Sequence, residues 1–291
     1  MQHTVATLQS LRLHVELIDG EDARRAMPVL GPRVIGASYS PRDAQINPLE
    51  LVVAYAEAAR KHGAVIQTFT DVVGIESDGS RICAVNTSQG RIATETVINA
   101  AGVWAADVAR MVGLDVPITP LKGELLVTEP MPPMMRGTLI AARYLASKAR
   151  AEEGEQSGPA SRRSVGVTLV QVRHGNFIVG STREQAGHDR RSTQAGMSEL
   201  SRQLLALAPR LADVHLLRSY AGLRPLTSDG KPFIGPMPAL PGFVMGAGYG
   251  GDGLVMSALS GQLIADMLTG TPDVDLAATF SYERFGLRQD P

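Results

Sequence analysis

The feature that most constrains the fold of this chain is a glycine-rich run, Gly246-Ala-Gly248-Tyr-Gly250-Gly251-Asp252-Gly253. It separates a strand-like segment, 242–246, from a helix-like segment, 254–268. Five glycines in eight residues allow backbone conformations and close approaches that a side chain would prevent. The first, second and fourth of them satisfy the pattern G-x-G-x-x-G, which predicts a tight turn from a strand into a helix.

The complete dinucleotide-binding fingerprint also requires a second strand and an acidic residue roughly 20 positions further on. Here the helix-like segment runs into Thr269-Gly-Thr-Pro272 and a tail that contains no second strand. We therefore reject an NAD-type interpretation of this loop. A second interpretation remains open. The loop would lead into a helix N-terminus whose free backbone N–H groups face a planar or anionic ligand. The alternative is a strand-to-helix turn that binds no ligand.

Two further motifs contain candidate binding residues. Arg224 stands between Gly222 and Pro225, which would hold its guanidinium in a set direction suited to bidentate carboxylate binding; a surface salt bridge is the alternative. The sequence Asn99-Ala100-Ala101-Gly102-Val103-Trp104 follows a predicted buried strand, 96–99. Its small residues permit close approach of a ligand or close packing of a helix, and the spacing favours neither.

Composition excludes several classes of protein. The 291 residues include 28 lysines and arginines and 29 aspartates and glutamates, which gives a net charge of −1. This near-neutral balance argues against a nucleic-acid-binding surface. The chain has no apolar run near the ~20 residues that a membrane span needs and no signal-peptide pattern at Met1, so we expect a cytoplasmic protein. One cysteine, Cys83, excludes an internal disulfide. The histidines have no metal-ligand spacing, so no metal site is assigned.

The order of predicted elements mixes helices with hairpins and lacks a strict βαβα alternation, which favours a mixed α/β (α+β) fold with two interleaved domains. The segment 147–164 is charged and small and is expected to be a mobile loop. Helices are predicted over 48–62, 105–112, 198–208 and 254–268, strands over 64–69, 72–76 and 82–87, a strand pair within 117–127, and a hairpin from 165–172 and 176–181.

Together with Asp43-Ala-Gln45-Ile-Asn47-Pro48, the three motifs resemble the D-amino-acid-oxidase-like flavoprotein family. This family includes glycine oxidase, sarcosine oxidase, D-amino-acid dehydrogenase and the flavin subunits of opine, hydroxyproline and cyanide-forming glycine dehydrogenases. The resemblance implies an FAD-binding domain interleaved with an antiparallel-sheet substrate domain. The implied segments are 1–46 (substrate domain and linker), 47–115 (FAD domain), 116–218 (substrate domain) and 219–291 (FAD domain).

The resemblance also implies roles for individual residues. Arg224 is expected to hold the substrate carboxylate, and Tyr249 is the second residue expected to be catalytic. Val72 is expected near the adenine of FAD. The other expected cofactor-binding residues are Ala100, Ala101, Gly102, Trp104, Gly222, Gly248, Gly250, Gly251, Asp252, Gly253 and Leu254.

The activity that the resemblance implies is oxidation of a C–N bond in an amino acid or secondary amino acid, by hydride transfer to flavin. Glycine-oxidase-like members carry a second arginine where this chain has Gly250-Gly251-Asp252, which favours a dehydrogenase subunit. The implied partners are an amino-acid substrate and other dehydrogenase subunits. Met131, Met134 and Met135 could form an adaptable surface for such a subunit or simply pack over the substrate domain.

One part of the family pattern is not found. Members open with a strand, a G-x-G-x-x-G turn and a helix that hold the FAD diphosphate, and nothing before Leu13 matches that unit. We therefore expect the chain to lack the first βαβ unit. The alternative to an active flavoenzyme is a non-catalytic truncated fragment, or a scaffold that binds a partner and holds no FAD.

Overall fold

The computed structural model describes residues 1–145 and 163–285. The chain divides into two compact units. Unit 1 consists of Met1–Ile46 and Lys122–Gly222, and unit 2 of Asn47–Leu121 and Leu223–Pro291. Both mix helices with largely antiparallel sheets, as predicted. Most of the expected loop 147–164 lies outside the described residues, and its last two residues begin a strand.

Unit 1 is built on a five-stranded sheet of order β11-β7-β10-β9-β8, in which β7, β10, β9 and β8 pair antiparallel. The strands are β7 (Ile118–Pro130), β8 (Thr138–Ile140), β9 (Arg163–Gln171), β10 (Asn176–Glu184) and β11 (Leu216–Thr227), of which β7 and β11 continue into unit 2. The predicted hairpin is confirmed as β9–β10. The predicted strand pair within 117–127 is wrong: this segment is one continuous strand, because its Lys122-Gly123 step stays extended.

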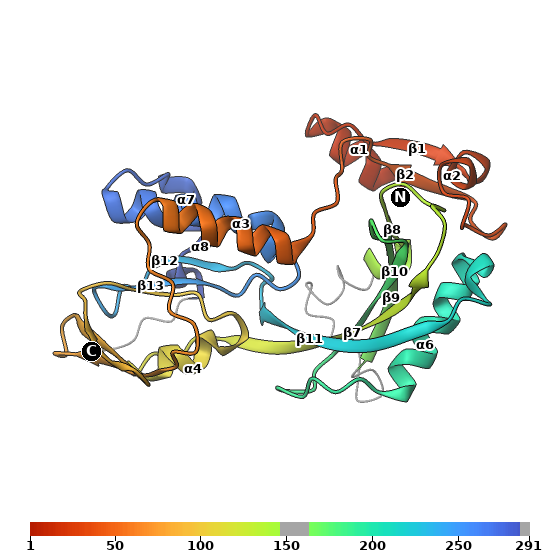
Figure 1. Ribbon diagram of the computed structural model, residues 1–291. Coiled ribbons are helices and arrows are strands. Elements are labelled where there is room, and N and C mark those ends of the chain that lie inside the picture. The colour runs from red at the N-terminus through yellow and green to blue at the C-terminus, as the bar shows by residue number, and fades with distance from the viewer. Residues whose placement is uncertain (146–162, 286–291) are drawn as a thin grey trace. The chain divides into compact units, whose positions relative to one another are not determined.

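A helix, α6 (Gln194–Leu207), packs against β9 and β10 in unit 1 (Figure 1). Its side chains Leu200 and Leu204 are buried in a core that also contains Leu169, Phe177 and Val179. The helix begins earlier than predicted because the Thr193 side chain accepts a hydrogen bond from the Gly196 N–H. The remaining elements are α1 (Gln2–Ser10), β1 (Glu16–Asp19), α2 (Gly20–Ala26), β2 (Gly36–Tyr39) and η3 (Pro209–Leu211).

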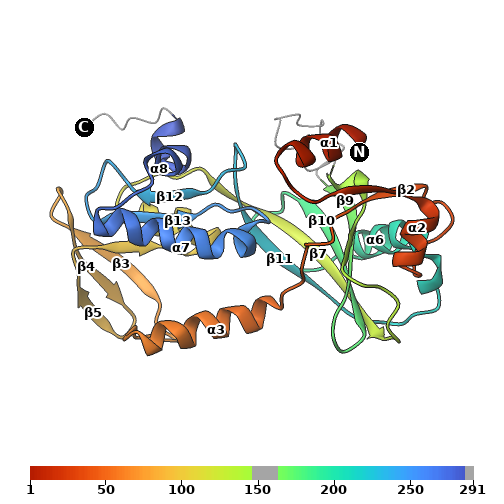
Figure 2. The same cartoon turned by 90° about the horizontal axis from the view of Figure 1, so that it is seen from above.

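Unit 2 contains two small sheets. In one, of order β12-β13-β6, β13 pairs antiparallel with β12 and parallel with β6. The other is the antiparallel meander β3-β4-β5, visible as a separate small sheet in Figure 2. The bounds are β3 (Val72–Ser77), β4 (Ile82–Thr87), β5 (Gly90–Ala93), β6 (Val97–Asn99), β12 (Phe233–Pro236) and β13 (Phe243–Ala247).

The helices of unit 2 lie on both sides of the β12–β13 pair. In Figure 1, α3 and α7 lie on one side of these strands and α4 on the other. The core on the α4 side includes Ile75, Ile82, Phe233, Phe243 and Met245. The bounds are α3 (Pro48–Lys61), η1 (Gly102–Trp104), α4 (Ala105–Arg110), α7 (Gly253–Thr269), α8 (Val274–Phe280) and η4 (Tyr282–Phe285).

Two predictions for unit 2 are corrected by the structure. Residues 64–69 do not form a strand. Val65 and Phe69 are 82% and 96% exposed, and Phe69 has a φ of 55°, a left-handed conformation that an extended strand does not allow. The strand β6 is present but is not fully buried, because Ile98 is 46% exposed.

No helix in residues 1–145 and 163–285 is both long enough and apolar enough to span a membrane.

Candidate functional site

Two of the sequence motifs meet at one edge of the parallel strand pair in unit 2. In the register of β6 and β13, Asn99 is the partner of Met245. Because parallel strands share a carboxyl edge, the turn after β6 and the glycine-rich loop after β13 leave the sheet at the same side. In open α/β sheets, ligands bind outside this edge. The candidate site is therefore built around this edge.

The turn after β6 is shaped by Asn99, a residue whose role the sequence did not reveal. Its side chain is buried, with 2% exposure, and Nδ2 donates to the Ala105 carbonyl at 2.8 Å. Its Oδ1 accepts from the Ala101 N–H at 3.2 Å. Within this turn Gly102 has a φ of 57°, and no atom lies within 4 Å of the position that a Cβ would occupy. Asn99 thus holds Ala100–Gly102 as a turn with open space beside Gly102.

The glycine-rich loop is fastened to the end of β11. Gly250 N donates to the Pro225 carbonyl at 2.7 Å, and Leu226 and Tyr249 form an isolated antiparallel bridge. Gly248 and Gly250 have φ values of 90° and 56°, so both depend on glycine. A Cβ at Gly248 would lie only 2.7 Å from the Thr227 Cγ2. These contacts explain two of the five glycines by local geometry.

Arg224 lies next to this loop. A Cβ placed on Gly251 would be 3.8 Å from both Cδ and Nε of Arg224, so the arginine stem runs alongside the Gly251 backbone. The side chain is half-buried. The structure therefore brings together Arg224 and the glycine-rich loop, which are more than twenty positions apart in the sequence.

Tyr249 lies along the glycines of its own loop and near α7. A Cβ at Gly246 would lie 3.9 Å from the Tyr249 hydroxyl oxygen. Burial raises the pKa of Tyr249 above its usual value, and the nearby Ser260 hydroxyl lowers it in part. The Ser260 Oγ is buried without a hydrogen bond of regular geometry among the described residues. Tyr249 is consequently a neutral phenol near neutral pH, and its catalytic role stays a prediction.

The helix that follows the loop presents its N-terminus at the same edge. In α7, Asp252 is the N-cap residue, and its side chain forms no capping hydrogen bond. The first backbone N–H groups of a helix lack partners within the helix and favour negative charge. Leu254 is 37% exposed. The helix N-terminus, the glycine-rich loop and the open space beside Gly102 fit one end of a flat, partly anionic cofactor.

The other predicted cofactor residues are Val72, Trp104 and Gly222, of which Gly222 belongs to unit 1. Val72 begins β3, pairs with Thr87 and is 41% exposed. Trp104 ends η1 and is half exposed. Gly222 lies on the part of β11 that belongs to unit 1. Contact of these three residues with a cofactor stays a prediction, as it does for the residues of the turn after β6 and of the glycine-rich loop.

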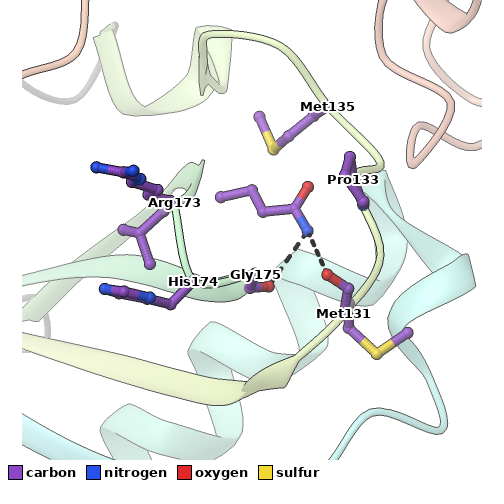
Figure 3. A pocket seen from close by; sticks show the side chains of 8 residues that line it. Met131, Pro133, Met135, Arg173, His174 and Gly175 are labelled. Carbon is purple, nitrogen blue, oxygen red and sulfur yellow. Dashed lines mark hydrogen bonds between the residues drawn. The ribbon is translucent and has the colours of Figure 1, made fainter.

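Unit 1 contains a shallow hollow of about 340 Å³ beside the methionines of the 130–135 segment (Figure 3). Gln171 organises it, because its Nε2 donates to the carbonyls of Met131 and Gly175 at 3.1 and 3.2 Å. The three methionines of the segment pack against the unit 1 core, which agrees with the packing interpretation. The hollow is lined by Met131, Pro133, Met135, Gln171, Val172, Arg173, His174 and Gly175.

Comparison with known proteins identifies the class. The profile of the FAD dependent oxidoreductase family (DAO) matches residues 1–267. The chain belongs to this family, whose members depend on FAD.

Particular relatives refine that assignment. The chain is 33% identical to the hydrogen cyanide synthase subunit HcnC of Pseudomonas aeruginosa over 90% of this chain and 58% of that protein. It is 29% identical to the glycine oxidase of Geobacillus kaustophilus over 92% of this chain and 65% of that protein. The chain thus spans less than two thirds of the length of these relatives.

Solved structures show the same fold. The glycine oxidase of Geobacillus kaustophilus matches with a TM-score of 0.83 and 27% identity, over 100% of this chain and 71% of that chain. The L-proline dehydrogenase of P. horikoshii matches with a TM-score of 0.82 and 27% identity, over 94% of this chain and 69% of that chain. The predicted fold class and family resemblance are therefore confirmed.

Proposed function

We propose that this chain functions in an FAD-dependent oxidoreductase that oxidises the C–N bond of an amino acid or secondary amino acid. The observation that carries the proposal is the position of Arg224 beside the glycine-rich loop, at the carboxyl edge of β6 and β13. The names of the relatives support an amino-acid substrate, since they include a glycine oxidase and an L-proline dehydrogenase.

Each part of the site has a role that follows from its chemistry. The Arg224 fork binds the substrate carboxylate, which fixes the α-carbon relative to the loop. Gly251 and Gly253 allow the backbone to approach a ring closely. The N-terminus of α7 favours negative charge at that ring. Bound FAD supplies the acceptor for the hydride that leaves the substrate α-carbon. Loss of the hydride from the α-carbon and of a proton from nitrogen to solvent leaves an imine, which water hydrolyses to a carbonyl compound and an amine.

We infer further that the whole protein is a dehydrogenase subunit rather than an oxidase. The resemblance to glycine-oxidase-like members implies a second arginine where this chain has Gly250-Gly251-Asp252, and one relative is named as a subunit of hydrogen cyanide synthase. A dehydrogenase subunit of this kind would pass its electrons to another protein and not to oxygen. Oxygen consumption that matches turnover without an added electron acceptor would contradict this part of the proposal.

Replacing Arg224 with leucine tests the substrate role in the FAD-loaded whole protein. We expect KM for the amino acid to rise roughly a hundredfold, because a charge-assisted bidentate contact is lost. Arg224→Lys should recover part of the loss, since it keeps the charge but not the fork. The control is Arg110→Leu, which removes an exposed partner of Asp107 on α4. An unchanged KM in Arg224→Leu would exclude the assigned role.

A second candidate is a non-catalytic chain that binds a partner and holds no FAD. The observation in its favour is that none of the fourteen residues of α3 is buried. A colourless but cooperatively folded 291-residue product would support it, whereas a yellow product with the absorption bands of a flavin would support the enzyme.

A further inference from the structure

The fold of unit 2 requires four of the five glycines in the glycine-rich loop. Two of them have positive φ values, which favour glycine. Two others are required by packing. A Cβ at Gly246 would lie 3.0 Å from the Ile264 side chain, and one at Gly253 would lie 3.2 Å from the Tyr249 Cβ. Both distances are shorter than the roughly 3.5–4.0 Å at which carbon atoms pack best, so a side chain at either position would force its neighbour to move.

The fifth glycine, Gly251, has neither of these reasons. Its φ lies outside the left-handed range that favours glycine, and the residue is exposed. A Cβ at this position would make ordinary contacts, at 3.8 Å, with Cδ and Nε of Arg224 and with no other described residue except its chain neighbours. Glycine in an ordered segment loses more conformational entropy on folding than alanine does. The missing side chain is therefore not demanded by the folded chain, and it points to a ligand that needs the space.

The space beside Gly251 borders the group that the proposed function assigns to the substrate carboxylate. Because Nε of Arg224 is one of the two atoms that a Cβ at Gly251 would touch, a larger side chain there would lie against the guanidinium fork itself. A carboxylate bound to this fork brings the α-carbon of an amino acid next to the guanidinium. Substituents on that carbon and on its nitrogen then need room on the same side as the fork.

We propose that Gly251 is a specificity-determining position, whose missing side chain admits an amino acid substituted at its nitrogen or α-carbon beside Arg224. The substrate class is therefore an amino acid larger than glycine. This inference rests on the proposed function, since it requires a carboxylate at Arg224. A valine at position 251 would fill the space next to Nε and exclude the substituent by overpacking.

Two adjacent glycines test the structural half of the proposal in the 291-residue chain, without added FAD. Gly251→Ala should raise the folding equilibrium constant by roughly two- to fivefold, because it restricts only the unfolded chain. Gly250→Ala is the matched control and should lower this constant by roughly five- to thirtyfold, since Gly250 has a φ of 56°. Urea denaturation read by hydrogen exchange in α7 peptides measures both. Equal losses in the two variants would show that the fold itself requires Gly251 and would overturn the proposal.

Turnover by the FAD-loaded protein tests the specificity. Glycine is compared with N-methylglycine and with both enantiomers of alanine and proline, and flavin absorbance corrects for cofactor content. In the original protein, kcat/KM should be higher for at least one larger amino acid than for glycine. Gly251→Val should lower kcat/KM for the best larger substrate roughly a hundredfold more than for glycine, mainly through KM, and Gly251→Ala roughly tenfold more. An unchanged ratio in both variants would overturn the proposal, as would turnover of glycine alone by the original protein.

The variant Arg224→Leu separates this inference from the proposed function. If it raises KM for every amino acid while Gly251→Val keeps the substrate ratio of the original protein, only the specificity role of Gly251 is wrong. If it leaves KM unchanged for all of them, the proposed function is wrong, and the role of Gly251 is excluded with it.

Discussion

Two helices of equal length, α3 in unit 2 and α6 in unit 1, have a similar amphipathic pattern and opposite surroundings. Each has fourteen residues and a side-chain N-cap, Asn47 or Thr193. Both are amphipathic. In α6, Leu200 and Leu204 are 0% and 5% exposed. In α3 none of the residues is buried. A similar local pattern therefore encodes a helix in both places. Only α6 packs its apolar face against the rest of its unit.

The difference extends to the helix N-termini. The cap of α6 is itself held by the protein, because Thr193 Oγ1 donates to Glu124 Oε1 at 3.0 Å. Glu124 is fully buried and faces Lys122, whose Nζ is 3.4 Å from Glu124 Oε1 and 3.3 Å from Glu184 Oε2. The cap of α3, Asn47, is exposed. A buried ionic cluster of Lys122, Glu124 and Glu184 therefore lies at the N-terminus of α6 in unit 1.

The largest expected effect comes from breaking this cluster. Lys122→Met leaves Glu124 buried without its cation, which should lower the free energy of unfolding of unit 1 by about 3–5 kcal/mol. Urea denaturation read by hydrogen exchange in β9–β10 peptides measures unit 1 separately. Lys122→Met with Glu124→Gln should recover much of the loss, because no uncompensated charge remains. A single variant as stable as the original protein would contradict this prediction.

The next effect compares one leucine in each helix. Leu200→Ala removes a fully buried side chain from α6 and should lower the free energy of unfolding of unit 1 by about 2–5 kcal/mol. Leu49→Ala removes a side chain that is 77% exposed, and its effect on unit 2 should stay within about 0.5 kcal/mol. Both are measured by urea denaturation of the 291-residue chain. Equal losses would mean that α3 is covered in solution.

The two helices also mark how far the fold could be predicted from the sequence. Asn47-Pro48 predicted the start of α3 correctly, because a cap and an N1 proline are local signals. A periodic pattern of apolar residues identifies the apolar face of a helix but not what covers that face. The same limit explains β6, which was expected to be buried. The segment 117–127 was expected to be a strand pair, but antiparallel pairing with β10 keeps it one extended strand through Lys122.

The candidate site was predictable in kind but not in geometry. The glycine-rich loop before α7 was evident from composition, and Arg224 was singled out by its neighbours Gly222 and Pro225. That Arg224 lies against Gly251 depends on the pairing of distant segments, which spacing does not reveal. Asn99 was missed as an organiser of the turn because its partner, the Ala105 carbonyl, becomes adjacent only when the turn has formed.

The smallest expected effect is a dependence of stability on pH, which should differ between the surroundings of α6 and those of α3. Burial raises the pKa of Glu184, but hydrogen bonds from Arg163 and Lys122 lower it more, so the folded-state value lies below the ordinary 4.5. A depressed carboxyl pKa stabilises the fold above the unfolded-state value, and this stabilisation is lost as pH falls through the folded-state value. Urea midpoints of unit 1 should therefore stay level from neutral pH to about 4.5 and fall below it.

Glu184→Gln provides the control for this pH dependence, because its amide does not titrate. Its urea midpoint should be lower near neutral pH and should fall less steeply in acid, and a slope equal to that of the original chain would exclude Glu184 as the source. Hydrogen exchange in α3 supplies the internal reference. Its cap is the uncharged side chain of Asn47, so the start of this helix has no titrating cap. Acid should therefore weaken the anchoring of α6 before it changes the capping of α3.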